Sequence, residues 1–216
     1  MRKSIIAILM TFCLSIMTYA QTPRDRATEL KEQAQSSLNQ KDYIKARYLF
    51  KKAYEAFATR ENYPQAIECG VQANALYVRE NFYKEGFELC RDMDQLIWAG
   101  EQNQKKVFYD LRFLVNKERL QMYTALKNPA QAKTQLNKLE ETANLAKNDS
   151  LTEVLLYTKA NYYYTFNQNT QGDACFRKLI NQYKEKKDYA KVSDCYKKLI
   201  GISTERTGQD NNNEYK

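Results

Sequence analysis

From Lys41 to Ala53 the chain reads KDYIKARYLFKKA, and this stretch decides the fold. Ala46, Phe50 and Ala53 are spaced by four and three positions, so all three lie on one face if the segment is helical. A helical hairpin with such a face cannot bury it alone and has to pack against further copies of itself. The stretch therefore predicts one helix in a stack of helical hairpins.

The composition favours helices throughout the chain. The 216 residues include only six glycines and three prolines, fewer turn residues than β-sandwiches and barrels need. Boundaries follow from cap signals, such as Asn128-Pro129 and the capping box from Ser150 to Glu153. We expect an all-α chain with helices at residues 24–40, 43–59, 64–80, 83–98, 102–127, 129–147, 151–167, 170–185 and 188–205.

A small residue recurs at matching places in the predicted hairpins. These anchors are Ala46, Gly86, Ala132 and Gly172. The residues four and seven positions after them are apolar or small, and they are Phe50, Cys90, Leu136, Phe176, Ala53, Met93, Leu139 and Leu179. Glycine inside a helix costs about 1 kcal/mol relative to alanine. We therefore interpret Gly86 and Gly172 as places where a neighbouring helix approaches closely.

This pattern resembles the tetratricopeptide repeat (TPR) family over roughly residues 24 to 200. The best copy is formed by Leu156, Ala160, Tyr163, Gly172, Phe176 and Leu179. The spacing is longer than the family's period, and the proline expected at the end of each unit is mostly absent. The resemblance implies a TPR-like α-solenoid of about four hairpins, closed by a capping helix at residues 188–205. It also implies a concave surface formed by the first helices of the hairpins.

The two ends of the chain differ from the predicted repeat domain, residues 21–206. A basic start, an apolar run from Ile5 to Met17 and a small residue at Ala20 predict a signal peptide over residues 1–20. The run is short for a membrane span, which needs about 20 apolar residues, although an uncleaved anchor is the alternative. Residues 207–216 are polar and aperiodic, so we expect a disordered tail or a linker to a further domain.

The charge is moderately basic. Loss of Arg2 and Lys3 with the signal peptide lowers the formal charge from +8 to +6. A basic balance can indicate nucleic-acid binding, but export removes the chain from most nucleic acid, so we expect no such partner. Solvated helix faces explain the charge most simply. An anionic lipid headgroup or an acidic polymer is the alternative, which is compatible with membrane proximity.

Four cysteines remain after cleavage of the signal peptide. An exported protein with an even number of cysteines can form disulfides. Cys69 and Cys90 flank one predicted turn, and Cys175 and Cys195 flank another, so both pairs could face each other across antiparallel helices. The alternative is that all four are small core residues with free thiols.

The residues offer little for catalysis. The chain has no histidine, which excludes Ser-His-Asp and Cys-His sites and removes the commonest metal ligand. It has no Cys-x-x-Cys pair and no glycine-rich phosphate loop. The adjacent acids Asp92 with Asp94, and Glu140 with Glu141, point to different sides of a helix. We expect no enzyme activity, no metal and no cofactor.

Aromatic residues are the remaining signal, with 17 tyrosines and nine phenylalanines. Tyrosine suits both a core and a binding groove, because an apolar ring carries a polar tip. Trp98, alone at the end of its helix, is interpreted as a packing anchor. The residues expected to line a groove are Asn74, Tyr77, Asn116, Asn161 and Tyr164.

These observations predict an exported, non-catalytic scaffold that binds a protein or peptide on its concave surface. Such a scaffold looks like the repeat regions of bacterial envelope regulators and assembly factors, located in the periplasm or associated with the cell envelope. The alternative is a small-ligand module, for example for a saccharide, that uses the tyrosine cluster near Tyr163. The sequence does not indicate the identity of the partner or the oligomeric state.

Overall fold

A computed structural model describes residues 25–207, and this part of the chain contains nine α-helices and no strand. The helices are α2 (Arg26–Asn39), α3 (Tyr43–Ala58), α4 (Tyr63–Arg79), α5 (Tyr83–Gln104), α6 (Tyr109–Ala125), α7 (Pro129–Ala146), α8 (Asp149–Thr165), α9 (Asn169–Glu185) and α10 (Tyr189–Thr207). The predicted all-α class is confirmed. The predicted signal peptide at residues 1–20 and residues 208–216 of the predicted tail lie outside the described residues.

The turns between helices share one geometry. Each of the eight junctions in the described part contains a residue with positive φ, namely Lys41, Glu61, Asn81, Lys105, Lys127, Lys147, Asn167 and Lys187. The next residue usually donates its backbone N–H to the carbonyl five positions back, as from Asp42 to Ser37 at 2.9 Å. This bond is the mark of a Schellman cap. It repeats about every 20 residues, once per helix.

Five of these turns also start the next helix with a side-chain cap, and four of the five caps share one geometry. The residue after the positive-φ position is Asp42, Asn62, Asn128 or Asp188, and its side-chain oxygen accepts from the backbone N–H three residues later. One helix therefore ends and the next begins within about three residues. Because the chain reverses so quickly, consecutive helices lie antiparallel and side by side.

Three predicted boundaries are wrong. The capping box at Ser150 does not form: α8 begins at Asp149, and Asn148 is the N-cap that accepts from the Ser150 N–H at 3.0 Å. The helix predicted to end at Trp98 continues to Gln104, and the helix predicted to begin at residue 102 begins at Tyr109. Gly100 does not break α5, because it lies against the rings of Phe108 and Tyr63 and leaves no room for a side chain.

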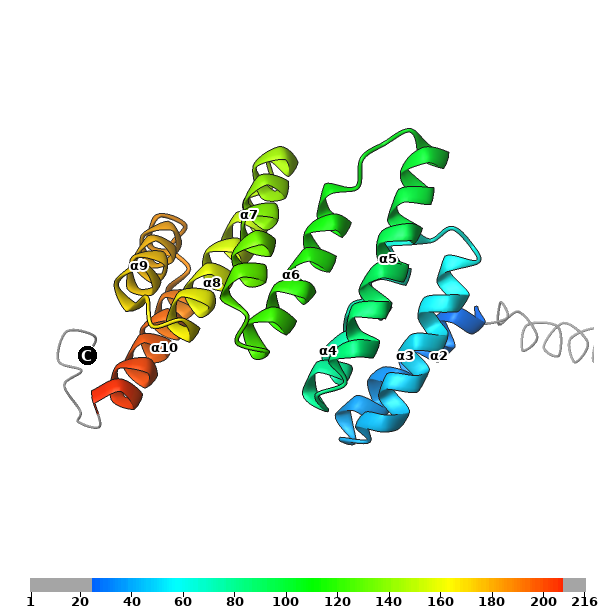
Figure 1. The fold of residues 1–216 in the computed structure, drawn as a ribbon, viewed down its shortest axis with the longest axis horizontal. Helices are drawn as coiled ribbons and strands as arrows, with labels where there is room; N and C mark the ends of the chain where they lie inside the picture. Colours follow the sequence, from blue (N-terminus) through cyan, green and yellow to red (C-terminus); the bar gives the residue numbers. More distant parts are fainter. Residues whose placement is uncertain (1–24, 208–216) are drawn as a thin grey trace, which may run out of the picture.

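The helices follow one another along the long axis of the molecule, from α2 at one end to α10 at the other (Figure 1). Each helix packs against its neighbours in sequence, and α4 also contacts α6, as α6 contacts α8. The interior forms three overlapping clusters, over α2–α6, α6–α8 and α8–α10. The first helices of the four predicted hairpins are α2, α4, α6 and α8, and α10 corresponds to the predicted capping helix.

The predicted repeat columns form this interior. All four anchors are buried, as are the eight residues four and seven positions after them. A Cβ atom at Gly172 would lie 2.7 Å from the Tyr164 ring, and one at Gly86 would lie 2.7 Å from the Met122 sulfur. The interpretation of both glycines as sites of close approach is confirmed.

The cysteines of the described part do not form disulfides. Cys69, Cys90, Cys175 and Cys195 are buried and free. Burial raises the pKa of Cys69 to about 11 and that of Cys90 to about 12, so both thiols are protonated at neutral pH. Of the two alternatives for the cysteines, disulfides or small core residues with free thiols, the structure has the core residues. Between residues 25 and 207, no helix has the length and apolarity to cross a membrane.

Candidate functional site

Two hollows lie side by side on the surface formed by α6, α8 and α10. One, of about 510 Å³, lies between α6 and α8, and the other, of about 420 Å³, lies where α8, α9 and α10 meet. Tyr157 on α8 borders both. We call the two together the Tyr157 groove; the solvent-accessible residues that line it are Lys117, Gln121, Thr124, Ala125, Lys127, Val154, Tyr157, Thr158, Asn161, Thr165, Lys191, Asp194, Lys197 and Lys198.

Tyr157 is an exposed aromatic ring with rigid support. Its side chain is 44% exposed, and its ring meets buried Phe176 edge to face, with centroids 5.5 Å apart and planes at 89°. Edge-to-face pairs of this kind are favourable beyond the area that they bury. The ring is therefore held from below by the core while one side remains open to solvent.

The lining of the groove is positive, although three of its five lysines take part in ion pairs. Five lysines line it and Asp194 is its one acid, and the lysines are Lys117, Lys127, Lys191, Lys197 and Lys198. Asp194 already pairs with Lys197 at 3.4 Å, and Lys191 pairs with Glu153 at 3.4 Å. The remaining surface offers ammonium groups, amides and hydroxyls around one aromatic ring. This arrangement suits an extended acidic chain with an apolar side chain.

A buried polar pair joins α4 to α6. Asn74 is 0% exposed and donates its side-chain N–H to the carboxylate of Glu118 at 3.1 Å, and Glu118 is 2% exposed. The other Glu118 oxygen is 3.5 Å from the ammonium group of Lys117. Desolvation is the largest influence and raises the pKa of Glu118, while Lys117 and Asn74 act in the opposite direction. The ionised form is therefore disfavoured by folding.

We expect Glu118→Gln to increase stability at neutral pH and to remove part of the pH dependence. A carboxyl group with a raised pKa binds its proton more tightly in the folded chain than in the unfolded chain, where it titrates near 4.3. Its contribution to stability is therefore lost as the pH rises through the folded pKa. Urea unfolding at several pH values measures the difference between variant and wild type, which should grow from pH 4 to pH 7.

Glu118→Ala is the matched comparison for this substitution. It leaves the buried Asn74 amide without its acceptor, which should reduce stability by about 1–3 kcal/mol at every pH. A Glu118→Gln variant that loses as much stability as Glu118→Ala at pH 7 would show that the buried carboxylate is needed as an ion.

The five predicted groove residues do not come together. Asn161 lines the Tyr157 groove, and Asn116 lines a different pocket. Asn74 belongs to the core and does not line a groove. Tyr77 lies under the Arg47 guanidinium, which is 4.8 Å from its ring centroid. Tyr164 donates its hydroxyl to Asp173 at 2.6 Å and packs against Gly172.

The prediction missed Tyr157 and the lysines of α10. Tyr157 lies four residues before Asn161, so the helical period could have placed it on the same face. The sequence favours solvated helix faces as the explanation of the lysines, and it predicts only a capping role for the helix that became α10. Their approach to Tyr157 depends on how α10 packs against α8 and α9, which no spacing within one helix reveals.

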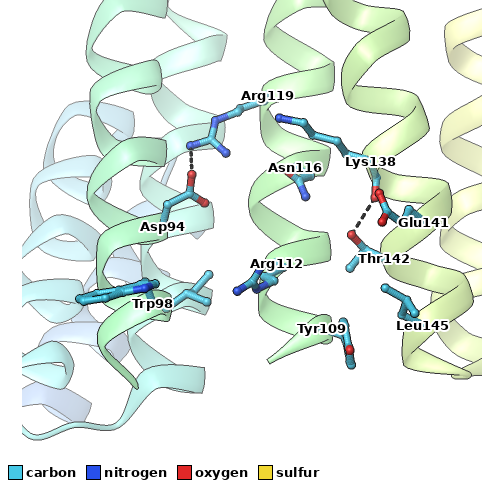
Figure 2. Close-up of a pocket in the computed structure, with 11 residues that line it drawn as sticks. Asp94, Trp98, Tyr109, Arg112, Asn116, Arg119, Lys138, Glu141, Thr142 and Leu145 are labelled. Atoms are coloured by element: carbon cyan, nitrogen blue, oxygen red, sulfur yellow. Dashed lines mark hydrogen bonds and ion pairs between the residues drawn. The ribbon is translucent and has the colours of Figure 1, made fainter. Parts of the chain in front are cut away.

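A second pocket, of about 440 Å³, lies between α5, α6 and α7 (Figure 2). We call it the Trp98 pocket. Its lining residues are Asp94, Ile97, Trp98, Tyr109, Arg112, Asn116, Arg119, Lys138, Glu141, Thr142 and Leu145. The interpretation of Trp98 as a packing anchor is wrong, because its side chain is 63% exposed. The residue lies on the outer side of α5, away from the α2–α6 core.

Ion pairs hold two arginines of the Trp98 pocket in place. Arg112 donates to buried Glu101 through Nε at 2.7 Å and also through Nη2, and Glu101 accepts the Phe108 N–H at 2.8 Å. Although burial of Glu101 opposes ionisation, these donors lower the pKa of its carboxyl group. Arg119 pairs with Asp94 at 2.5 Å (Figure 2). Both guanidinium groups are therefore oriented before any ligand arrives.

One acid of each neighbouring pair considered for catalysis is engaged in an ion pair with a different helix. Asp94 pairs with Arg119, and Glu140 pairs with Lys159 at 2.5 Å. The described residues contain no group of three or more metal-ligating side chains. No protein-family model matches the chain, and no curated protein matches its sequence.

Proposed function

We propose that the chain is a TPR-like α-solenoid that binds an extended acidic segment of another protein along the Tyr157 groove and has no catalytic activity. The contacts of α6 with both α4 and α8, and the buried repeat columns, support stacking of about four hairpins with α10 as a cap. The first 20 residues have the features of a signal peptide, which supports export to the periplasm or cell envelope.

One observation supports an acidic peptide as the partner. The exposed ring of Tyr157 packs on buried Phe176 and is surrounded by five lysines and one acid. Lysines attract a polyanionic chain, and the aromatic ring gives an apolar residue of that chain a place to pack. Asn161, Thr158 and Gln121 add donors and acceptors for the backbone of an extended peptide.

We expect acidic peptides to bind the domain more tightly than basic or neutral ones. A peptide array of seven-residue sequences that combine Asp, Glu and one aromatic residue provides the probes, and fluorescence anisotropy gives the dissociation constants. Tyr157→Ala should weaken binding about tenfold, which corresponds to 1.4 kcal/mol. Lys197→Glu with Lys198→Glu should abolish the preference for acidic sequences, and added salt should weaken wild-type binding.

Tyr48→Ala serves as the control, because Tyr48 on α3 is also exposed but lies far along the row from the groove. It should leave peptide binding unchanged. Equal binding of acidic and basic peptides would contradict the proposal, as would tighter binding of a single-stranded oligonucleotide, which also suits a basic aromatic surface.

The alternative site for a small ligand, the tyrosine cluster near Tyr163, is mainly interior. Tyr162 is buried and packs with Tyr163 and Phe166 at centroid distances of 5.4 and 5.0 Å. Tyr164 stacks on Phe176. These rings stabilise the junctions of α8 with its neighbours, so the structure does not favour this cluster as a saccharide pocket.

A further inference from the structure

The Trp98 pocket takes no part in the proposed peptide groove. Its floor is α6 and its walls are the second helices α5 and α7, whereas the Tyr157 groove runs over α6, α8 and α10. Its volume of about 440 Å³ falls within the range of about 300–1,000 Å³ that is typical of small-molecule sites. The pocket is therefore large enough for a ligand of its own.

Most of the large ring and aliphatic side chains of the pocket gather at one end. Trp98 on α5, Tyr109 on α6 and Leu145 on α7 lie at this end (Figure 2). Trp98 is 63% exposed and Leu145 is 52% exposed. Large apolar side chains that remain exposed on two walls of one hollow mark a place where a ligand can cover them. The electron-rich face of an indole also attracts polarised C–H groups.

The opposite end is polar but carries little net charge. Arg119, Lys138 and Asn116 lie there, whereas Arg112 lies level with Trp98 and Leu145 (Figure 2). Two of the three cations are paired with an acid: Glu101 pairs with Arg112 and Asp94 with Arg119. Glu141 lies three residues after Lys138 on α7, so the formal charges of the three cations and three acids cancel. A strongly charged ligand of either sign therefore gains little from the pocket as a whole.

The hydrogen-bonding groups left open are mixed. Arg112 uses Nε and Nη2 on Glu101, so its Nη1 group remains for a ligand. Asp94 uses Oδ2 on Arg119, so its Oδ1 oxygen remains as an acceptor. Asn116 supplies both a donor and an acceptor. A carboxylate would only accept and would meet Asp94 and Glu141, while an ammonium group would only donate and would meet the arginines.

We propose that the Trp98 pocket binds a neutral saccharide. A hydroxyl group both donates and accepts, so a polyhydroxylated ring can satisfy the donors and acceptors around Asn116. The apolar C–H face of the same ring can cover the indole of Trp98. The mixed polar lining, the cancelled charge and the exposed tryptophan all fit this class of ligand.

Binding to an array of immobilised glycans tests the proposal, with neutral oligosaccharides and uronate-containing oligosaccharides on the same surface. We expect neutral glycans to bind more strongly than the uronates. Trp98 is the one tryptophan of the chain, so titration with the best neutral oligosaccharide should change its fluorescence in a saturable manner. Calorimetry should show at least tenfold weaker binding for Trp98→Ala and for Asn116→Leu.

Tyr157→Ala is the matched control, because it removes an exposed aromatic ring from the other surface and should leave glycan binding unchanged. The proposal is overturned if no neutral glycan binds, if uronates bind as tightly, or if Trp98→Ala keeps the wild-type affinity. Displacement of the glycan by N-acetyl-leucine but not by its amide would also overturn it, since an amphipathic carboxylate would then be the better ligand. Circular dichroism establishes that each variant is folded.

Discussion

Phe176→Ala is expected to reduce the free energy of unfolding by about 3–5 kcal/mol, the usual cost of removing a fully buried phenylalanine. Phe176 is 0% exposed in the α8–α10 cluster. Its ring packs against Tyr157 and Tyr164, with centroids 5.5 and 6.1 Å away. Loss of the ring leaves a cavity between α8 and α9 and removes the support of Tyr157. Urea unfolding measures the loss, and peptide binding should weaken as well.

We also expect the destabilisation caused by Phe176→Ala to be confined to the helices near the substitution. Helices in such a row contact only near neighbours, so hydrogen exchange should speed up in α8–α10 and remain slow in α2–α4. Phe82→Ala is the matched control, since Phe82 is 44% exposed at the start of α5 and its removal should cost much less. Equal losses for both variants, or uniform loss of protection along the chain, would contradict the assigned packing.

Gly172→Ala is expected to destabilise the chain by about 1–3 kcal/mol, although alanine is normally the better helix former by about 1 kcal/mol. The added Cβ atom would lie 2.7 Å from two atoms of the Tyr164 ring. That ring cannot easily move, because its hydroxyl donates to Asp173 and its face stacks on Phe176. Thermal unfolding followed by circular dichroism provides the measurement.

Gly201→Ala is the control for the Gly172 substitution. Gly201 also lies within a helix, but nothing lies within 4 Å of the place where its Cβ atom would be. This substitution should stabilise α10 by up to about 1 kcal/mol through helix propensity. If both alanine variants gain stability, the close approach of Tyr164 to Gly172 does not restrict the helix.

The helices could be predicted because their signals are local. The spacing of Ala46, Phe50 and Ala53 and the caps at Asn62 and Asn128 depend only on neighbours in the sequence. The error at Ser150 has the same origin: Asn148 is an equally good local cap two residues earlier, and it prevails. The recurring turn also has a local sequence signal, a Lys-Asp pair at residues 41–42 and again at residues 187–188. This signal is difficult to recognise because lysine and aspartate are also common on exposed helix faces.

The candidate site could not be predicted in the same way. Asn74 and Tyr164 lie on helices as predicted, but their side chains are engaged by neighbouring helices. The Asn74 side chain contacts Glu118, and the Tyr164 ring packs against Gly172. The position of Trp98, alone at the end of its predicted helix, favours a packing role, whereas in the structure its side chain is 63% exposed. Which side of a helix is covered depends on the angle and distance of its neighbours, and these are not encoded in the spacing of one segment.

The amino-acid order alone determined the class of structure, the ends of most helices and the columns of small and apolar residues that become the interior. It could do so because helix period, capping and burial of apolar groups act over a few residues at a time. Only the tertiary structure decided that Tyr157 borders the same hollow as the lysines of α10, and that an exposed Trp98 lines one pocket with two arginines held by ion pairs. Those arrangements join residues from three helices, so they exist only after the helices have packed.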